Sequence, residues 1–138
     1  MTDKEIIMGN DEICQALGFE SNRVYVYKVP NTFPFENERD TGWTELNTQA
    51  ICFHSDWNML VGAYNRIRTL VFNMTDTQKE ILKDHKNFLT NFAVKNVFSI
   101  SIDNQLRIER AWRMLTDFCK WYNGAKFVGV KSPPSSQI

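Results

Sequence analysis

The chain is 138 residues long, with 43% hydrophobic and 23% charged side chains, which is the size and composition of one soluble globular domain. Sixteen basic and sixteen acidic side chains cancel, so no whole-molecule field draws the protein to nucleic acid or to a membrane surface. The three cysteines are widely spaced and form no CxxC pair, which argues against a disulfide framework and a zinc site. Because the sequence has neither the apolar core of a signal peptide nor a run of about 18 apolar residues, we expect a cytoplasmic protein that does not enter the membrane.

The first elements predicted along the chain are a helix and a strand. The segment NDEICQALGF (10–19) has the pattern of a short helix, with Asn10 or Asp11 as its N-cap and a backward extension through residues 6–7. The segment VYVYKV (24–29) is rich in β-branched and aromatic residues, which predicts a strand that ends at the following proline.

A long surface loop is expected over residues 31–47, because this segment has no hydrophobic periodicity. The segment AICFH (50–54) then predicts a second strand, and Ser55 is placed to cap the helix that follows. That helix carries an apolar stripe at spacings of three and four residues and ends near Phe72. Trp57 begins the stripe, so we expect it to be buried against the sheet.

The second half of the chain predicts two further helices and a third strand. A capping box formed by Thr75 and Gln78 opens a helix over residues 76–92. The segment VFSISI (97–102) alternates apolar and small polar residues, as a half-buried strand does. Asp103 is the expected cap of a last helix, which should stop at Asn123 and Gly124.

These elements predict an α+β fold, in which a small sheet of about three strands is covered by amphipathic helices. We expect a single compact domain over residues 1–127. The polar ending KSPPSSQI belongs to a tail, 128–138, that we expect to be disordered.

Cys52 and His54 are the pair that could support nucleophilic catalysis. Two positions apart on a predicted strand, their side chains would face the same side and could form a thiolate–imidazolium pair. Same-face neighbours on a strand are about 6.5 to 7 Å apart, and no segment indicates an oxyanion hole. A small Cys/His hydrolase is therefore the least favoured interpretation, and we expect no catalytic residues.

The sequence indicates no cofactor and no metal site. GxxxxGK[ST] and GxGxxG stretches are absent, so ATP and NAD binding are not expected. The chain has two histidines, and His85 lies on an otherwise apolar face of its predicted helix. That position favours a packing role over an acid–base or metal-binding role.

Aromatic side chains in the predicted long loop offer a surface for binding another protein, because Trp and Phe are frequent interface anchors. Acidic side chains are interleaved with them, and packing of the same aromatics onto the core is the alternative. The candidate binding residues are Phe33, Phe35, Glu36, Glu38, Asp40 and Trp43.

Basic side chains on two predicted helices provide a second hypothesis, the binding of RNA or another single-stranded nucleic acid. No RNP, KH or helix-turn-helix signature accompanies these charges, so this hypothesis ranks below protein binding. The candidate residues are Lys79, Lys83, Lys86, Arg107 and Arg110.

Two stretches of the chain carry a family pattern. FHSDWNMLV (53–61) and IERAWRMLTDFCKWYN (108–123) resemble the signatures YHSDWNWLM and IEAVYNACVEFIKWYN of small, mostly uncharacterised proteins encoded by phages and prophages of Bacteroidetes. The resemblance implies a phage-related, cytoplasmic protein with a compact helix-on-sheet fold, and it implies no particular reaction. The agreeing positions are His54, Ser55, Asp56, Trp57, Asn58 and Leu60 in the first stretch, and Ile108, Glu109, Phe118, Lys120, Trp121, Tyr122 and Asn123 in the second.

We therefore expect a non-enzymatic, phage-related accessory protein that binds a host protein. Small phage proteins without cofactor motifs commonly act by occupying a host protein. An inhibitor of a bacterial defence system, such as an anti-CRISPR protein, is the most concrete form of this hypothesis. The partner would then be a CRISPR effector or another defence nuclease in the cytoplasm of the bacterial host.

Overall fold

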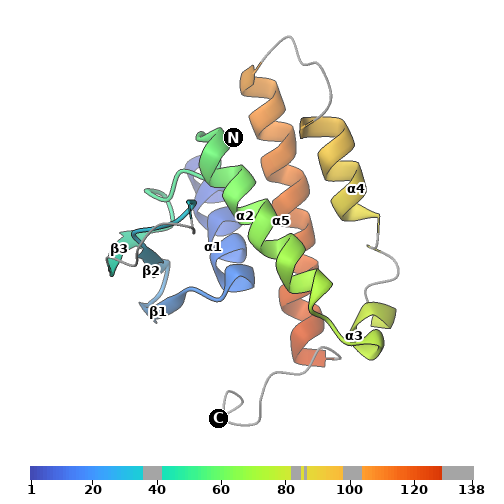
Figure 1. The fold of residues 1–138 in the computed structure, drawn as a ribbon. Coiled ribbons are helices and arrows are strands. Elements are labelled where there is room, and N and C mark those ends of the chain that lie inside the picture. Colours follow the sequence, from blue (N-terminus) through green and yellow to red (C-terminus); the bar gives the residue numbers. More distant parts are fainter. Residues whose placement is uncertain (36–41, 82–84, 86, 98–103, 129–138) are drawn as a thin grey trace.

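The computed structural model describes residues 1–35, 42–81, 85, 87–97 and 104–128. Within them the chain forms the predicted α+β fold, in which a three-stranded sheet lies on one side of a group of helices (Figure 1). The elements in chain order are α1 (Asp3–Leu17), β1 (Glu20–Arg23), β2 (Val26–Pro30), β3 (Trp43–Asn47), α2 (Trp57–Phe72), α3 (Asp76–Ile81), α4 (Phe88–Phe92), the short π-helix η2 (Ala93–Val97) and α5 (Asn104–Val128).

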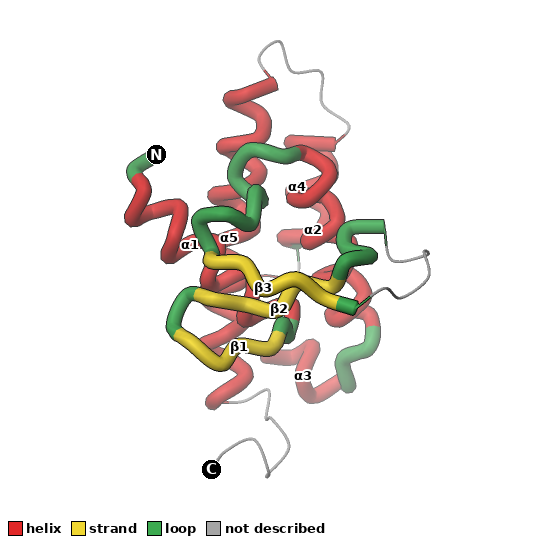
Figure 2. Tube along the Cα trace, turned by 90° about the vertical axis from the view of Figure 1, so that its left-hand side faces the viewer, coloured by secondary structure: helices red, strands yellow, loops and turns green. Residues whose placement is uncertain are grey.

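The sheet is antiparallel, with β2 between β1 and β3. Tyr27 and Val29 of β2 are buried against the helices, while the alternate residues of the strand belong to the opposite face. Figure 2 shows this opposite face in front of the helices, with no helix of the described chain covering it. The sheet therefore has one core face and one open face, as antiparallel sheets commonly do.

Helix α5 packs along α1 and α2 and holds the helical layer together (Figure 1). A Cβ added at Gly9 of α1 would lie 2.3 Å from Cζ2 of Trp112, so glycine at this position lets α1 approach the indole closely. Helix α4 joins the core through Phe92, which stacks on Tyr64 of α2 with 4.2 Å between ring centroids.

Helix α1 begins well before Asn10, so the predicted N-caps are wrong and the backward extension through residues 6–7 is confirmed. The helix starts with a capping box: Thr2 Oγ1 accepts a hydrogen bond from the Glu5 backbone N–H (3.1 Å), and the Glu5 carboxylate accepts one from the Thr2 backbone N–H (3.2 Å). Asn10 instead lies fully buried in the middle of the helix.

The predicted strand over residues 50–54 is wrong, because this segment forms successive turns. The backbone N–H of Asp56 donates to the carbonyl of Cys52 (2.9 Å), a local bond that takes the place of strand pairing. The cap of α2 is Asp56 and not Ser55, since a carboxylate oxygen of Asp56 accepts a hydrogen bond from the backbone N–H of Asn58 (2.9 Å).

The third strand comes from a segment predicted as loop. Residues 31–47 end in β3, where Leu46 pairs opposite Tyr27 and faces the core side of the sheet. The strand predicted over 24–29 begins only at Val26, because Tyr25 lies in the turn between β1 and β2 with a φ of 60°. The described residues form three strands, as many as predicted, but only β2 arises from a segment predicted as a strand, and β1 and β3 do not.

The helix predicted over residues 76–92 is not continuous, because α3 ends at Ile81 and α4 begins at Phe88. Of the strand predicted over 97–102, Val97 belongs to η2 and the other residues lie outside the described residues. The predicted cap Asp103 and the part of the predicted tail beyond Val128 also lie outside them.

Helix α5 is longer than predicted, since it continues through Asn123 and Gly124. The side-chain N–H₂ of Asn123 donates to the backbone carbonyl (2.8 Å) and the carboxylate (3.1 Å) of Glu12. These bonds connect α5 to α1. Asn123 is buried and lies within α5, so α5 does not end at this residue.

Candidate functional site

A half-exposed tryptophan marks the open face of the sheet. Trp43 begins β3 opposite Pro30 of β2, and 54% of its surface is exposed. The ammonium group of Lys28 lies 4.6 Å from the centroid of its ring, which is a cation–π contact. The indole is a large apolar group. Because about half of it stays exposed, that part of its apolar area contributes nothing to the free energy of folding.

A hollow of about 280 Å³ lies beside this tryptophan, lined by strand residues, by the segment between α1 and β1 and by one residue of α2. We name the residues that line it the Trp43 surface: Gly18, Phe19, Glu20, Lys28, Pro30, Trp43 and Arg66. Its charges are partly paired, since Lys28 Nζ lies 3.6 Å from a carboxylate oxygen of Glu20. Surface ion pairs of this kind contribute little free energy. The free energy that this surface can offer to a partner therefore comes mainly from the indole.

The structure separates the aromatic candidates of the sequence analysis. Phe33 is only 8% exposed and packs edge-to-face on Phe19 (5.5 Å) and Phe53 (6.1 Å), so it belongs to the core and cannot anchor a partner. Phe35, by contrast, is 56% exposed and, like Trp43, remains a candidate. The acidic candidates Glu36, Glu38 and Asp40 lie outside the described residues.

The basic candidates that the structure describes do not gather into one area. Arg107 lies over the ring of Trp57, 4.2 Å from its centroid, so Trp57 packs on α5. Trp57 is partly buried there, whereas we expected it to be buried against the sheet. The guanidinium of Arg110 donates to Asn96 Oδ1 (2.9 Å) and to the backbone carbonyl of Lys95, which joins α5 to η2. Lys79 is exposed, and the other two candidate lysines, Lys83 and Lys86, lie outside the described residues.

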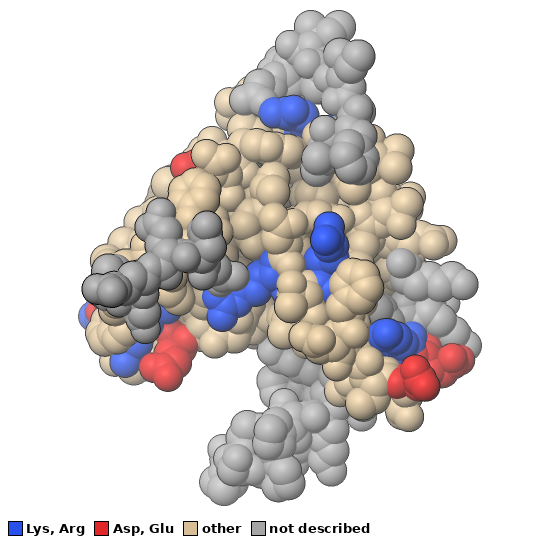
Figure 3. Space-filling model, in the orientation of Figure 1, with Lys and Arg blue, Asp and Glu red and all other residues tan. Residues whose placement is uncertain are grey.

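A basic area on α2 was not among the candidates predicted from the sequence. Arg68 is exposed, and the guanidinium of Arg66 lies 5.3 Å from the ring centroid of Phe19. Phe72, one turn after Arg68, is 70% exposed. Figure 3 shows Lys and Arg side chains near the centre of the face that bears α2, and Asp and Glu only toward its margins among the described residues. The spacing of four residues between Arg68 and Phe72 was the signal in the sequence, because it puts both on one face of a helix.

The segment around His54 is organised by a buried asparagine. The side-chain N–H₂ of Asn10 donates to the backbone carbonyls of Thr48 (2.8 Å) and Ile51 (2.9 Å). Its Oδ1 accepts a hydrogen bond from the indole N–H of Trp112 (2.8 Å). One side chain of α1 thus joins the turns that precede α2 to helix α5.

His54 completes this network as a neutral ring. Its Nδ1 lies 3.1 Å from the Asn10 side-chain nitrogen and, when the ring proton is on Nε2, can share one of the two amide protons with a backbone carbonyl. Burial lowers the pKa of His54 and so favours the neutral form. The thiol of Cys52 donates to the backbone carbonyl of Ala50 (3.3 Å), and in the described part of the chain no hydrogen bond joins it to His54. The arrangement gives this joint a structural role and does not assemble the Cys–His pair.

His85 belongs to an aromatic cluster. Its ring stacks on Trp121, with 4.1 Å between centroids, and meets the edge of Phe118 at 6.3 Å. Among the residues that the structure describes, no group of three or more His, Cys, Asp or Glu side chains could hold a metal ion.

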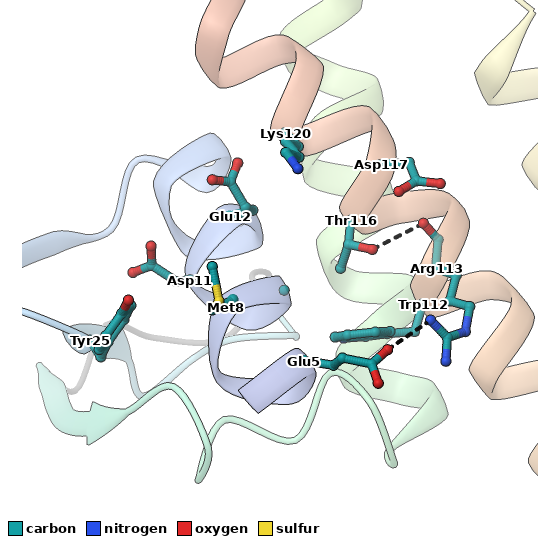
Figure 4. Close-up of a pocket in the computed structure, with 11 residues that line it drawn as sticks. Glu5, Met8, Asp11, Glu12, Tyr25, Trp112, Arg113, Thr116, Asp117 and Lys120 are labelled. Carbon is teal, nitrogen blue, oxygen red and sulfur yellow. Dashed lines mark hydrogen bonds and ion pairs between the residues drawn. The ribbon is translucent and has the colours of Figure 1, made fainter. Parts of the chain in front are cut away.

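A second hollow, of about 370 Å³, lies between α1 and α5 (Figure 4). None of the candidates from the sequence lies in it, because its side chains meet only when the two helices pack. We name it the α1–α5 groove; it is lined by Glu5, Met8, Gly9, Asp11, Glu12, Tyr25, Trp112, Arg113, Thr116, Asp117 and Lys120.

Comparison with known proteins gave no match among protein-family models, curated proteins or solved structures. The likeness to phage and prophage proteins therefore stays a prediction. In the described ranges, every helix is too short or too polar to cross a membrane.

Proposed function

We propose that the protein is a non-enzymatic, phage-related accessory protein that binds a host protein through the Trp43 surface. The observation that carries this proposal is the half-exposed Trp43 on the open face of the sheet, next to a hollow. Tryptophan is among the residues most enriched at the energetic centres of protein interfaces, where its ring is fully removed from water. The most concrete form of the proposal is inhibition of a CRISPR effector or another defence nuclease.

The layout of the surface is consistent with a docking role. The ring already contacts Lys28, so less side-chain freedom is lost when a partner covers it. The paired charges around it form a polar rim, and the hollow accepts a projecting side chain of the partner.

The test is a quantitative pull-down from a Bacteroidetes lysate with three forms of the tagged protein: the parent, Trp43→Ala and Phe72→Ala. Phe72 is the matched control, because it is also an exposed aromatic and lies on α2. We expect one host protein to be retained by the parent and by Phe72→Ala and to be lost with Trp43→Ala. If all three forms retain the same proteins, the Trp43 surface is not the binding site.

The inhibitor form has its own readout. The parent protein, expressed in a host with an active CRISPR system, should raise the transformation efficiency of a targeted plasmid, and Trp43→Ala should not. A parent protein that leaves this efficiency unchanged would remove CRISPR inhibition from the proposal while leaving host-protein binding open to the pull-down.

A second candidate function is the binding of single-stranded nucleic acid, favoured by the basic area on α2. Arg68 and the exposed ring of Phe72 combine a cation with a stacking platform, which is the pattern of sequence-tolerant strand binding. Fluorescence anisotropy with a labelled single-stranded RNA should then show an affinity that falls steeply with salt and drops in Phe72→Ala but not in Trp43→Ala. A flat salt dependence would exclude this function.

A further inference from the structure

The α1–α5 groove has a rigid floor. Trp112 lies across it, is almost fully buried and is anchored by the hydrogen bond from its indole N–H to Asn10 (2.8 Å). Its ring rests against α1 at Gly9, where there is no room for a Cβ. The groove is therefore built before any ligand arrives, and its volume of about 370 Å³ is that of a small binding pocket.

The positive charge at one end of the groove is already neutralised by ion pairs. The guanidinium of Arg113 lies 3.1 Å from a carboxylate oxygen of Glu5 and 3.2 Å from one of Glu109. Figure 4 shows the first of these pairs beside Trp112. With two carboxylates on one cation, this end offers no net attraction to an anion.

Other carboxylates of the groove are held by uncharged donors. Asp11 accepts hydrogen bonds from the phenol of Tyr27 (2.6 Å) and the side-chain amide of Gln15 (2.7 Å). Glu12 accepts one from the side-chain amide of Asn123 (3.1 Å). Burial raises the pKa of Tyr27, and the hydrogen bond to Asp11 raises it further. The phenol therefore stays protonated and remains a donor. These bonds fix the carboxylates in position but do not cancel their charge.

An apolar rim adjoins these carboxylates. Met8 and Tyr25 line the groove, are both exposed, and flank the α1 side of Figure 4. The backbone of Tyr25 has a φ of 60°, which is unfavourable for a residue other than glycine. The carbonyl of Tyr25 accepts a hydrogen bond from the Thr48 N–H (2.9 Å), which helps to hold this conformation.

We propose that the α1–α5 groove binds a Lys- or Arg-bearing segment of a partner protein. The aliphatic stem of the basic side chain packs on Met8 and Tyr25, and its cation lies beside Asp11 and Glu12. Four carboxylates against two cations on the lining give the charge complementarity for this occupant and disfavour phosphate-bearing ligands. The site is independent of the Trp43 surface, with which it shares no residue.

The experiment is a selection of random dodecapeptides displayed on phage, carried out on the parent protein and on two double variants. Glu12→Gln with Asp117→Asn removes two charges from the groove and leaves an acceptor oxygen at position 12. Asp76→Asn with Glu80→Gln removes two charges from α3, which contributes nothing to the groove. We expect peptides enriched in Lys and Arg from the parent and from the α3 variant, and no such enrichment from the groove variant.

The best selected peptide is then measured by fluorescence anisotropy at physiological ionic strength. Its Kd should rise about tenfold in the groove variant and change less than about twofold in the α3 variant. Thermal melts of all three proteins establish that the variants are folded. Peptides without basic enrichment, or equal affinities for the parent and the groove variant, would overturn the proposal.

Discussion

Replacement of Asn10 by alanine should destabilise the protein more than its small change in volume suggests. The substitution leaves the buried carbonyl of Thr48 and the buried indole N–H of Trp112 without their partner, while the carbonyl of Ile51 keeps only its bond from the Phe53 backbone N–H (2.8 Å). An unsatisfied buried polar group costs about 1–3 kcal/mol, so two of them lower the free energy of unfolding by at least about 2 kcal/mol. That is a large share of the roughly 5–15 kcal/mol that stabilises a domain.

Urea unfolding followed by tryptophan fluorescence measures this loss. The matched control is Asn65→Ala, because Asn65 is an exposed asparagine in the middle of α2. Its removal should change the free energy of unfolding by less than about 0.5 kcal/mol, or raise it slightly through the better helix propensity of alanine. A loss below about 1 kcal/mol for Asn10→Ala would refute the view that Asn10 holds the turns and α5 together.

Three further outcomes are expected. Because burial lowers the pKa of His54 below that of the unfolded chain, the unfolded state binds the proton first, so stability should fall as pH drops below about 6.5. Urea titrations should show this slope in the parent and not in His54→Gln. Gly9→Ala should lower the melting temperature despite the helix propensity of alanine, because the added Cβ meets Trp112; an unchanged melt would contradict the close packing. Iodoacetamide should label the exposed Cys52 before the two buried cysteines, as mass spectrometry of the intact protein would show, and equal labelling would argue that the core opens readily.

The fold class followed from the sequence because amphipathic stripes and β-rich segments are local signals. The stripe that starts at Trp57 gave α2 with correct bounds, and the β-rich segment 24–29 gave most of β2. The strand prediction for the apolar run 50–54 was wrong, because the backbone carbonyl of Ile51 accepts a hydrogen bond from Asn10, a residue about forty positions earlier. Such a long-range hydrogen bond leaves no trace in local composition.

The candidate site could be predicted from the sequence only in part, for a similar reason. Phe33 and Phe35 have the same side chain and nearly the same neighbours in sequence, yet one is in the core and the other is exposed. The difference depends on packing against Phe19 and Phe53, which the sequence does not encode locally. The α1–α5 groove could not be predicted from the sequence at all, since its two walls are about a hundred residues apart in the chain.

Photo-crosslinking in the host cell tests the central claim, that the Trp43 surface binds a host protein, most directly. A photoreactive phenylalanine analogue would replace Trp43 in one variant and Phe72 in a second, so that both probes sit at exposed aromatic positions. The proposed function predicts a covalent adduct with one host protein from position 43 and none from position 72. Adducts at position 72 alone, or equal adducts at both positions, would contradict it.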